Sequence, residues 1–240
     1  MDPNLKKGTL YLIPAPIGEC LLSKVIPSYN LGILENLRHF IVEDIRTARR
    51  FLKKAIPSYN IDLATFLVFN EHTDRSRLDL FLEPLNNGND TGLLSEAGLP
   101  CIADPGSEIV RMAHQSGVQV VPLSGPSSLF LALMSSGFNG QQFCFHGYLP
   151  VEKKSRARKL RELEREMILH DQAQLFIEAP YRNLQLFQSI LEICAEETLL
   201  CIASDLTLST EYISMKPVRD WKKITPDIQK RPAVFLLYKE

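Results

Sequence analysis

The feature that most constrains the fold is a regular alternation of short apolar runs and helical segments over residues 8–147. The first run, at 8–14, is rich in β-forming residues and stops at Pro14. Runs of the same kind follow, and they lie at 38–44, 65–72, 91–96 and 118–123. Strands that alternate with helices form a mostly parallel sheet with the helices packed on its faces. We therefore predict an α/β domain in this part of the chain.

Residues 45–56 have the pattern of an amphipathic helix. The apolar side chains of Ile45, Ala48, Phe51 and Leu52 fall near one side, and five basic residues occupy the other, namely Arg46, Arg49, Arg50, Lys53 and Lys54. Pro57 should end the helix, because proline cannot continue the hydrogen-bond ladder.

Three further helices are predicted between the runs. Residues 75–87 should be helical up to about Pro84. Residues 107–117 begin with Ser107, which we expect to be the N-cap, and stop at Gly117. A helix after Ser127 should end at Gly137.

The character of the chain changes near residues 145–150, where Gly147 and Pro150 interrupt the pattern. A charged, helix-prone segment follows at 151–167. Beyond it we expect a helix from about Tyr181 to Cys194 and strands at 173–178, 199–204, 210–215 and 233–239. The sequence thus predicts two domains, an N-terminal domain at 1–147 and a smaller α/β domain with a mixed sheet at 148–240.

Composition and charge exclude several classes of protein. The net charge of −1 at pH 7 is unlike that of a polycationic nucleic-acid binder, so any contact with nucleic acid must rest on local patches. Residues 1–8 lack the apolar core of a signal peptide, and no apolar run is long enough to cross a membrane. Five cysteines without a C-x-x-C pair indicate free thiols in a reducing compartment and no metal site. We expect a cytoplasmic protein.

Five predicted strands end in unusual loops. In an open parallel sheet, ligands bind outside the carboxyl ends of the strands. The loops there are rich in glycine, which lets the backbone approach a ligand, and in proline, which fixes the loop; they lie at 13–18, 42–46, 69–72, 93–106 and 122–128. Neither a phosphate-binding G-x-x-x-x-G-K-[ST] loop nor a G-x-G-x-x-G fingerprint is present. His72 and His114 lack metal-ligand spacing, and we expect them to be surface or capping residues.

These loops, in this order, resemble the motifs of the tetrapyrrole methylase superfamily, the class III S-adenosylmethionine-dependent methyltransferases. They look most like the ribosomal RNA small-subunit methyltransferase I group, whose pattern includes P-T-P-I-G-N, A-E-D-T-R, H-N-E, S-D-A-G-T-P-x-I-S-D-P-G, P-G-P-S-A, F-x-G-F-L-P, E-S-P-x-R and R-E-L-T. The matching segments are 14–19, 42–46, 69–71, 95–106, 124–128, 145–150, 178–182 and 204–207. The chain departs from the pattern at Ile45, at Glu96 and at Ser204-Asp205.

The resemblance implies two tetrapyrrole-methylase-like α/β domains, a bound S-adenosylmethionine between them, and a homodimer. It also implies that backbone groups exposed by the Gly/Pro loops hold the cofactor, while a nearby carboxylate favours its sulfonium cation. Carried over position by position, the cofactor-binding residues are Pro14, Ala15, Pro16, Ser95, Glu96, Gly98, Leu99, Pro100, Ser127, Ser128, Ala203 and Ala233.

Carboxylates at the strand ends are candidates for a general base. A ribose 2′-hydroxyl is a poor nucleophile at neutral pH, so a base would assist its methylation. Glu43, Asp44 and Glu71 are the candidates. An equally good interpretation for Glu43 or Asp44 is that it caps the following helix, whose N-terminus favours anions.

Two basic segments, 46–54 and 153–165, could contact RNA phosphates, although a solvated helix face is the default interpretation of the second. Three functions remain open. The first is 2′-O-methylation of a cytidine in small-subunit ribosomal RNA. The second is methylation of a tetrapyrrole or another small molecule by an enzyme of the same superfamily. The third is RNA or ribosome binding without catalysis.

Overall fold

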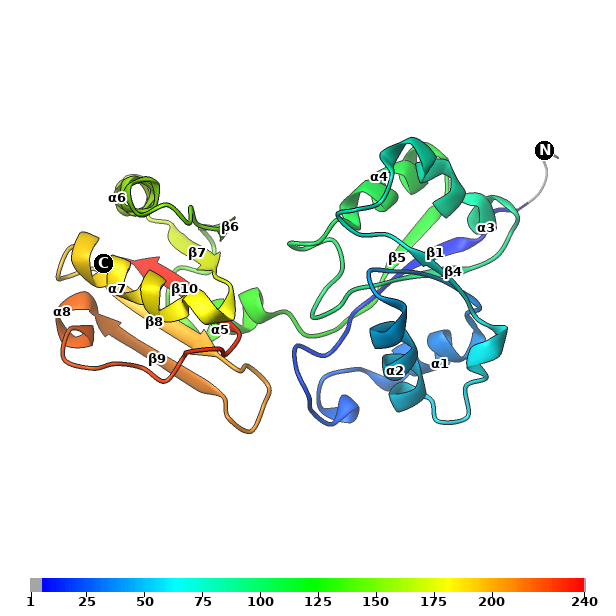
Figure 1. Ribbon diagram of the computed structural model, residues 1–240, viewed down its shortest axis with the longest axis horizontal. Coiled ribbons are helices and arrows are strands. Elements are labelled where there is room, and N and C mark those ends of the chain that lie inside the picture. Colours follow the sequence, from blue (N-terminus) through cyan, green and yellow to red (C-terminus); the bar gives the residue numbers. More distant parts are fainter. Residues whose placement is uncertain (1–5, 240) are drawn as a thin grey trace. The chain divides into compact units, whose positions relative to one another are not determined.

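The computed structural model describes residues 6–239, so part of the segment inspected for a signal peptide lies outside the described residues. The chain forms two compact units, which divide between Ser127 and Ser128 (Figure 1). Within residues 6–239 no helix is both long and apolar enough to span a membrane.

The first unit contains a five-stranded sheet in the order β3-β2-β4-β1-β5. Its strands are β1 (Thr9–Ile13), β2 (His39–Val42), β3 (Thr65–Val68), β4 (Thr91–Leu94) and β5 (Gln119–Pro122). Every neighbouring pair is parallel. The predicted parallel sheet is therefore confirmed, and the carboxyl ends of all five strands lie at one edge.

Helices cover both faces of this sheet (Figure 1). On one face lie α1 (Ser28–Asn36) and α2 (Ile45–Ala55), whose Leu34 and Leu52 are fully buried. On the other face lie the 3₁₀ segment η3 (Arg75–Phe81), α3 (Glu83–Asn86) and α4 (Ser107–Gln115). Two short 3₁₀ turns, η1 (Leu22–Lys24) and η2 (Ile61–Leu63), complete the unit. Because β2 and β4 are neighbours whose chains continue to opposite faces, a crevice opens at their carboxyl ends.

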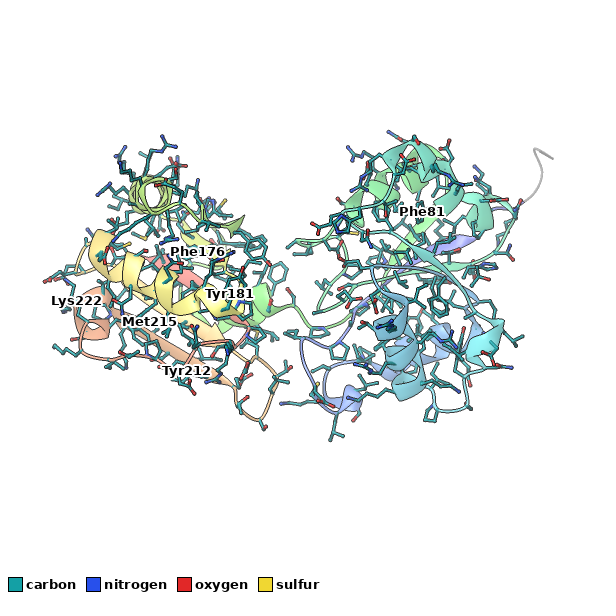
Figure 2. The ribbon with its side chains drawn as sticks, in the orientation of Figure 1. Phe81, Phe176, Tyr181, Tyr212, Met215 and Lys222 are labelled. Atoms are coloured by element: carbon teal, nitrogen blue, oxygen red, sulfur yellow. The ribbon has the colours of Figure 1, made fainter. Side chains whose placement is uncertain are left out.

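Two of the predicted helices differ in detail. Residues 75–81 form a 3₁₀ segment interrupted at Arg77, and Pro84 lies in the first turn of α3, where proline needs no N–H partner. Phe81, which is labelled in Figure 2, lies at the end of η3. Its ring packs edge-on against that of Phe69, with centroids 5.2 Å apart. Ser107 is the first residue of α4 and not its N-cap; Gly106 precedes it, and no side chain caps this helix.

The second unit contains a mixed sheet, as predicted, in the order β6-β7-β10-β8-β9. Its strands are β6 (Phe143–Tyr148), β7 (Ala173–Ile177), β8 (Leu199–Ser204), β9 (Tyr212–Pro217) and β10 (Ala233–Tyr238). Only β6 and β7 pair in parallel, and the other neighbours are antiparallel.

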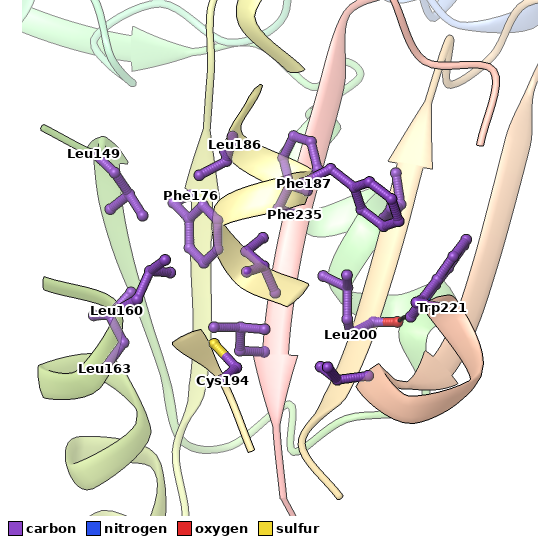
Figure 3. Packing of buried hydrophobic residues seen from close by; sticks show 14 of the residues in the cluster. Leu149, Leu160, Leu163, Phe176, Leu186, Phe187, Cys194, Leu200, Trp221 and Phe235 are labelled. Atoms are coloured by element: carbon purple, nitrogen blue, oxygen red, sulfur yellow. Dashed lines mark hydrogen bonds between the residues drawn. The ribbon is translucent and has the colours of Figure 1, made fainter. Parts of the chain in front are cut away.

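Helices also cover both faces of the second sheet. The apolar helix α5 (Ser128–Ser136) packs on one face. On the other face lie α6 (Lys153–His170), α7 (Asn183–Ile193), which follows the 3₁₀ turn η4 (Pro180–Arg182), and α8 (Val218–Trp221). Trp221 of α8 is fully buried and donates a hydrogen bond of 2.9 Å to the Leu200 carbonyl oxygen (Figure 3). The aromatic and aliphatic side chains around it form the core of this unit (Figure 3).

The two compact units divide between Ser127 and Ser128, whereas the sequence predicts a boundary at 147/148. Residues 143–148 form β6, which pairs with β7, and α5 packs on the same sheet, so both belong to the second unit. Gly147 has a φ of +64°, and the register of β6 shifts between Phe145 and Tyr148. Such a shift is typical of a β-bulge, where glycine relieves the backbone strain. The glycine that suggested a linker therefore bends a strand.

Candidate functional site

The loops after β1 and β4 are joined by their backbones. The Ala15 N–H donates to the Gly98 carbonyl over 2.9 Å, and the Gly98 N–H donates to the Ala15 carbonyl over 3.0 Å. Gly98 has a φ of +74°, a conformation that other residues adopt only with strain. The motif glycine at this position is thus required by the backbone, and it fixes the loop 95–100 to the loop that carries Pro14 and Pro16.

The loop after β5 packs against the same pair. A Cβ atom on Gly125 would lie 2.3 Å from side-chain atoms of Pro14, so only glycine fits there. The carbonyl oxygen of Pro126 lies 3.6 Å from the position of a Cβ on Gly98. Ser127, which is nearly buried, ends this loop, and Ser128 begins α5. The structure thus brings together the three strand-end loops that carry the predicted cofactor-binding residues of the first unit.

The long loop 95–106 is held by its own side chains. The Ser95 hydroxyl donates to the Ala97 carbonyl over 2.9 Å. Asp104 Oδ1 accepts hydrogen bonds from the N–H groups of Cys101 and Gly106, both at 2.8 Å, while Cys101 has a φ of +69°. Burial nevertheless raises the pKa of Asp104. Leu99 and Pro100 lie between the Ser95–Ala97 hydrogen bond and the Cys101–Asp104 hydrogen bond. The loop is therefore held together by its own hydrogen bonds.

Carboxylates gather at the ends of β2 and β4. Burial raises the pKa of Glu43, and the negative charges of Asp104, Glu96 and Glu71 raise it further, while a hydrogen bond from the Glu96 N–H opposes the rise. Burial likewise raises the pKa of Glu96, and the charge of Asp44 adds to this. A half-buried carboxylate with a raised pKa is a better proton acceptor than an exposed one.

The three predicted base candidates have different surroundings. Asp44 is the N-cap of α2: its Oδ1 accepts hydrogen bonds from the Thr47 N–H at 2.8 Å and from the Thr47 hydroxyl at 3.0 Å. These bonds lower the pKa of Asp44 and occupy its carboxylate. Glu71 is exposed in the turn after β3, and its Oε1 lies 3.5 Å from His72 Nε2. Of the three, only Glu43 combines partial burial with a raised pKa.

A cavity of about 330 Å³ opens beside these carboxylates. One wall is formed by Ala15, Pro16, Ser95 and Glu96, which belong to the predicted cofactor-binding set. The opposite wall is α2, which contributes Thr47, Ala48, Arg50, Phe51 and Lys54. Val42 and Leu94 line both this cavity and a smaller pocket at Glu43 and Asp104. The cavity and the Glu43 carboxylate therefore adjoin.

Ala203 and Ala233, the predicted cofactor residues of the second unit, lie on paired strands. Ala203 is next to the last residue of β8, and Ala233 is the first residue of β10, where it pairs with Ser204. Asp205, which has a φ of +50°, follows β8 and accepts a 2.8 Å hydrogen bond from Arg231 Nε. Asp205 thus supplies a carboxylate where the R-E-L-T pattern has glutamate. This carboxylate pairs with Arg231, which lies in the loop before β10.

Comparison with known proteins identifies the family. The chain is 32% identical over 211 residues to the ribosomal RNA small subunit methyltransferase I of Vibrio cholerae, covering 88% of this chain and 69% of that protein. It is 30% identical over 237 residues to the protein of the same name from Pasteurella multocida, covering 98% and 80%. This chain belongs to the ribosomal RNA small subunit methyltransferase I family. No protein-family model matches the chain.

Two solved methyltransferase structures share the fold of this methyltransferase I family member. The crystal structure of the methyltransferase CobJ superposes with a TM-score of 0.64 at 16% identity, over 97% of this chain and 100% of that one. The uroporphyrin-III-C-methyltransferase of Thermus thermophilus gives a TM-score of 0.55 at 16% identity, over 97% and 92%. The predicted tetrapyrrole-methylase-like fold is confirmed.

The α2 wall of the cavity in this methyltransferase I homologue was predicted only in part: Arg50 and Lys54 belong to the basic segment expected to contact RNA, whereas Thr47 and Phe51 were not among the predicted site residues. Thr47, Arg50, Phe51 and Lys54 are spaced i, i+3, i+4 and i+7, so they form one stripe along the helix. That spacing is visible in the sequence. It was overlooked because the helix was divided into one apolar and one basic face, and this stripe lies on the border between them.

Proposed function

We propose that this chain methylates small-subunit ribosomal RNA at the 2′-hydroxyl of a cytidine, with S-adenosylmethionine as methyl donor. The curated relatives are named as ribosomal RNA small subunit methyltransferases, and the fold is that of known methyltransferases. The observation that carries the proposal is the cluster at the carboxyl edge of the first sheet. There a proton-accepting carboxylate, Glu43, adjoins a cavity walled by the family's cofactor motifs.

The residues present fit S-adenosylmethionine. The paired loops 13–18 and 95–100 both contribute to the cavity, whose lining is mostly apolar with Ser95 and Glu96 as polar groups, as a nucleoside-bearing cofactor requires. We propose that Pro14–Pro16, Ser95, Glu96, Gly98–Pro100, Ser127 and Ser128 hold the cofactor, and that Ala203 and Ala233 of the second unit complete its site. When bound, S-adenosylmethionine supplies a methyl group made electrophilic by its sulfonium. The first unit would also hold the substrate.

We assign the roles of general base and helix cap to neighbouring residues. Glu43 accepts the proton of the ribose hydroxyl, because its raised pKa brings it toward the operating pH, where a general base is most effective. Asp44 fixes the start of α2, since its carboxylate is used by Thr47. Glu71 raises the pKa of Glu43 through its charge and remains exposed.

The motif resemblance also bears on the oligomeric state and on the cellular location. On the motif resemblance we propose that the protein works as a homodimer in the cytoplasm, and sedimentation analysis tests the first of these. A sedimentation coefficient that corresponds to a monomer at micromolar concentration contradicts the homodimer.

Transfer of labelled methyl groups tests the proposed function. The purified chain is incubated with methyl-labelled S-adenosylmethionine and small ribosomal subunits that lack the modification, or with a uroporphyrinogen-type tetrapyrrole. The proposal predicts labelled ribosomal RNA and an unlabelled tetrapyrrole. Unlabelled subunits at saturating cofactor contradict it. Calorimetry with S-adenosylhomocysteine separates a wrong substrate from a protein that binds no cofactor.

A further inference from the structure

The cavity of the first unit has two chemically different walls. The loop wall carries Ser95 and Glu96 next to the Glu43 pocket. The helix wall presents Phe51 between two cations, Arg50 and Lys54, which lie one helical turn apart. A cavity with apolar surface, two cations at one side and carboxylates at the other can hold an amphipathic anion better than a neutral ligand.

The basic side chains of α2 differ in their ion pairs and hydrogen bonds. Arg49 forms an ion pair with Asp62, with Nη2 and Oδ1 separated by 3.6 Å, and Lys53 donates a 2.6 Å hydrogen bond to the Tyr59 carbonyl. Arg50 and Lys54 have neither a hydrogen bond nor an ion pair with any residue in the described part of the chain, 6–239. Within residues 6–239 the Arg46 side chain has no such partner either, but it does not line the cavity, so Arg50 and Lys54 are the unpaired cations available to a ligand there.

Two unpaired cations at i and i+4 suit a phosphate group. Side chains one turn apart on a helix lie close enough together to contact one anion, and a guanidinium donates two parallel hydrogen bonds to phosphate oxygens. Phe51 between them, with Ile17 and Leu22 from the facing loop, supplies the apolar surface that a base requires. A phosphate with an attached nucleoside satisfies both parts of the cavity.

We propose that the α2 side of this cavity receives the target nucleotide of the RNA, with its phosphate on Arg50 and Lys54 and its ribose toward Glu43, while Ala15, Pro16, Ser95 and Glu96 on the loop side contact the cofactor. This inference rests on the proposed function, because it assumes an RNA substrate. Val42 and Leu94 line both the cavity and the Glu43 pocket, so a nucleotide in the cavity would lie next to the proposed base. A cavity of about 330 Å³ can enclose a single nucleotide but not a stacked helix, so the nucleotide enters unpaired.

Glu19 also lines the cavity, and its carboxylate opposes the phosphate. Glu19→Gln removes this repulsion without changing the size of the side chain. The inference therefore predicts that Glu19→Gln raises RNA affinity, whereas Arg50→Gln and Lys54→Gln lower it.

The test compares variants of one helix. Fluorescence anisotropy measures the binding of a single-stranded RNA oligonucleotide over a range of salt concentrations. Arg50→Gln and Lys54→Gln should each lower affinity about fivefold and reduce the slope of log affinity against log salt by about 0.7 to 1. Arg49→Gln, which removes the same charge from the same helix outside the cavity, is the matched control and should change affinity less than about twofold. Equal losses in all three variants overturn the inference.

Two further measurements fix the nature of the ligand. Cytidine monophosphate should compete with the oligonucleotide for the unsubstituted chain and lose this effect in Arg50→Gln, while inorganic phosphate at the same concentration should not compete. Competition by phosphate alone overturns a nucleotide site in favour of a simple anion site. Affinity for S-adenosylhomocysteine should be unchanged in Arg50→Gln.

The inference and the proposed function fail in different ways. If the unsubstituted chain labels no ribosomal RNA but Arg50→Gln and Lys54→Gln still weaken oligonucleotide binding selectively, the proposed function is wrong and the nucleotide site stands. If the chain labels ribosomal RNA and both variants keep the KM for small subunits and the oligonucleotide affinity of the unsubstituted chain, the nucleotide site is wrong and the function stands.

Discussion

Ala15 and Gly98 exchange two backbone hydrogen bonds, 2.9 and 3.0 Å long, which join the loops that follow β1 and β4. The pairing holds the two predicted cofactor loops in one fixed arrangement, so little conformational entropy is lost when a ligand binds. It also depends on a φ of +74° at Gly98.

Replacing Gly98 tests this arrangement. Gly98→Ala should lower the free energy of unfolding by about 1 kcal/mol, because alanine is strained at positive φ. It should also weaken the binding of S-adenosylhomocysteine, since strain at Gly98 would disturb the backbone pairing that fixes the two predicted cofactor loops. Urea unfolding and calorimetry measure the two effects.

Gly117→Ala is the matched control for this change. Gly117 has a φ of +66° at the end of α4, and no atom lies within 4 Å of its Cβ position. It should lose similar stability and keep full affinity for S-adenosylhomocysteine. Equal affinity losses in the two variants would mean that the Gly98 loop has no special part in cofactor binding.

Glu43 and Asp44 should respond differently to neutralisation. Glu43→Gln removes the proposed base and should lower kcat at least about 100-fold, with unchanged affinity for S-adenosylhomocysteine. Asp44→Asn keeps an N-cap residue of nearly equal quality, so both kcat and stability should stay close to those of the unsubstituted chain. Steady-state methylation assays at saturating substrate measure kcat. A fully active Glu43→Gln variant would show that Glu43 is not the base.

The charge of Asp104 should move the pH profile. A general base works when deprotonated, so kcat rises as the pH passes the pKa of Glu43. Asp104 raises that pKa, and Asp104→Asn should therefore shift the acidic limb of the profile to lower pH. Asparagine can keep the Oδ1 bonds to Cys101 and Gly106. Glu71→Gln should shift the limb in the same direction by less, because Glu71 contributes least of the three carboxylates. An unmoved limb in both variants excludes Glu43 as the group that titrates.

The Asp205–Arg231 pair should stabilise the second unit. Both side chains are mostly buried, with exposures of 11% and 19%, and the bond is 2.8 Å long. Asp205→Asn tolerates the left-handed backbone but removes the charge, and should cost about 2 kcal/mol in urea unfolding. Glu197→Gln, which breaks an exposed pair with Arg219, should cost less than about 1 kcal/mol. Equal costs would mean that burial adds nothing to the Asp205 pair.

The architecture was predictable because its signals are local. Five apolar runs with Gly/Pro loops predicted β1 to β5 and the edge where the loops meet, and the motifs predicted the family. The unit boundary was not predictable, because Gly147 looks the same in a linker and in a bulged strand. Only the pairing of β6 with β7 distinguishes the two.

The site was predictable only in part. The sequence could not decide between base and cap for Glu43 and Asp44, since that depends on which carboxylate reaches the Thr47 N–H. Nor could it separate Arg49 from Arg50, because their difference arises from Asp62, which lies beyond the end of α2. Both distinctions rest on tertiary contacts between residues that share the same local pattern.

The position of the transferred methyl group tests the central claim most directly. Small subunits labelled by the chain are digested to nucleosides and separated by chromatography coupled to mass spectrometry. The account predicts that the label migrates with 2′-O-methylcytidine and that Glu43→Gln abolishes it. Label on a base, on another nucleoside, or undiminished in Glu43→Gln would contradict the account.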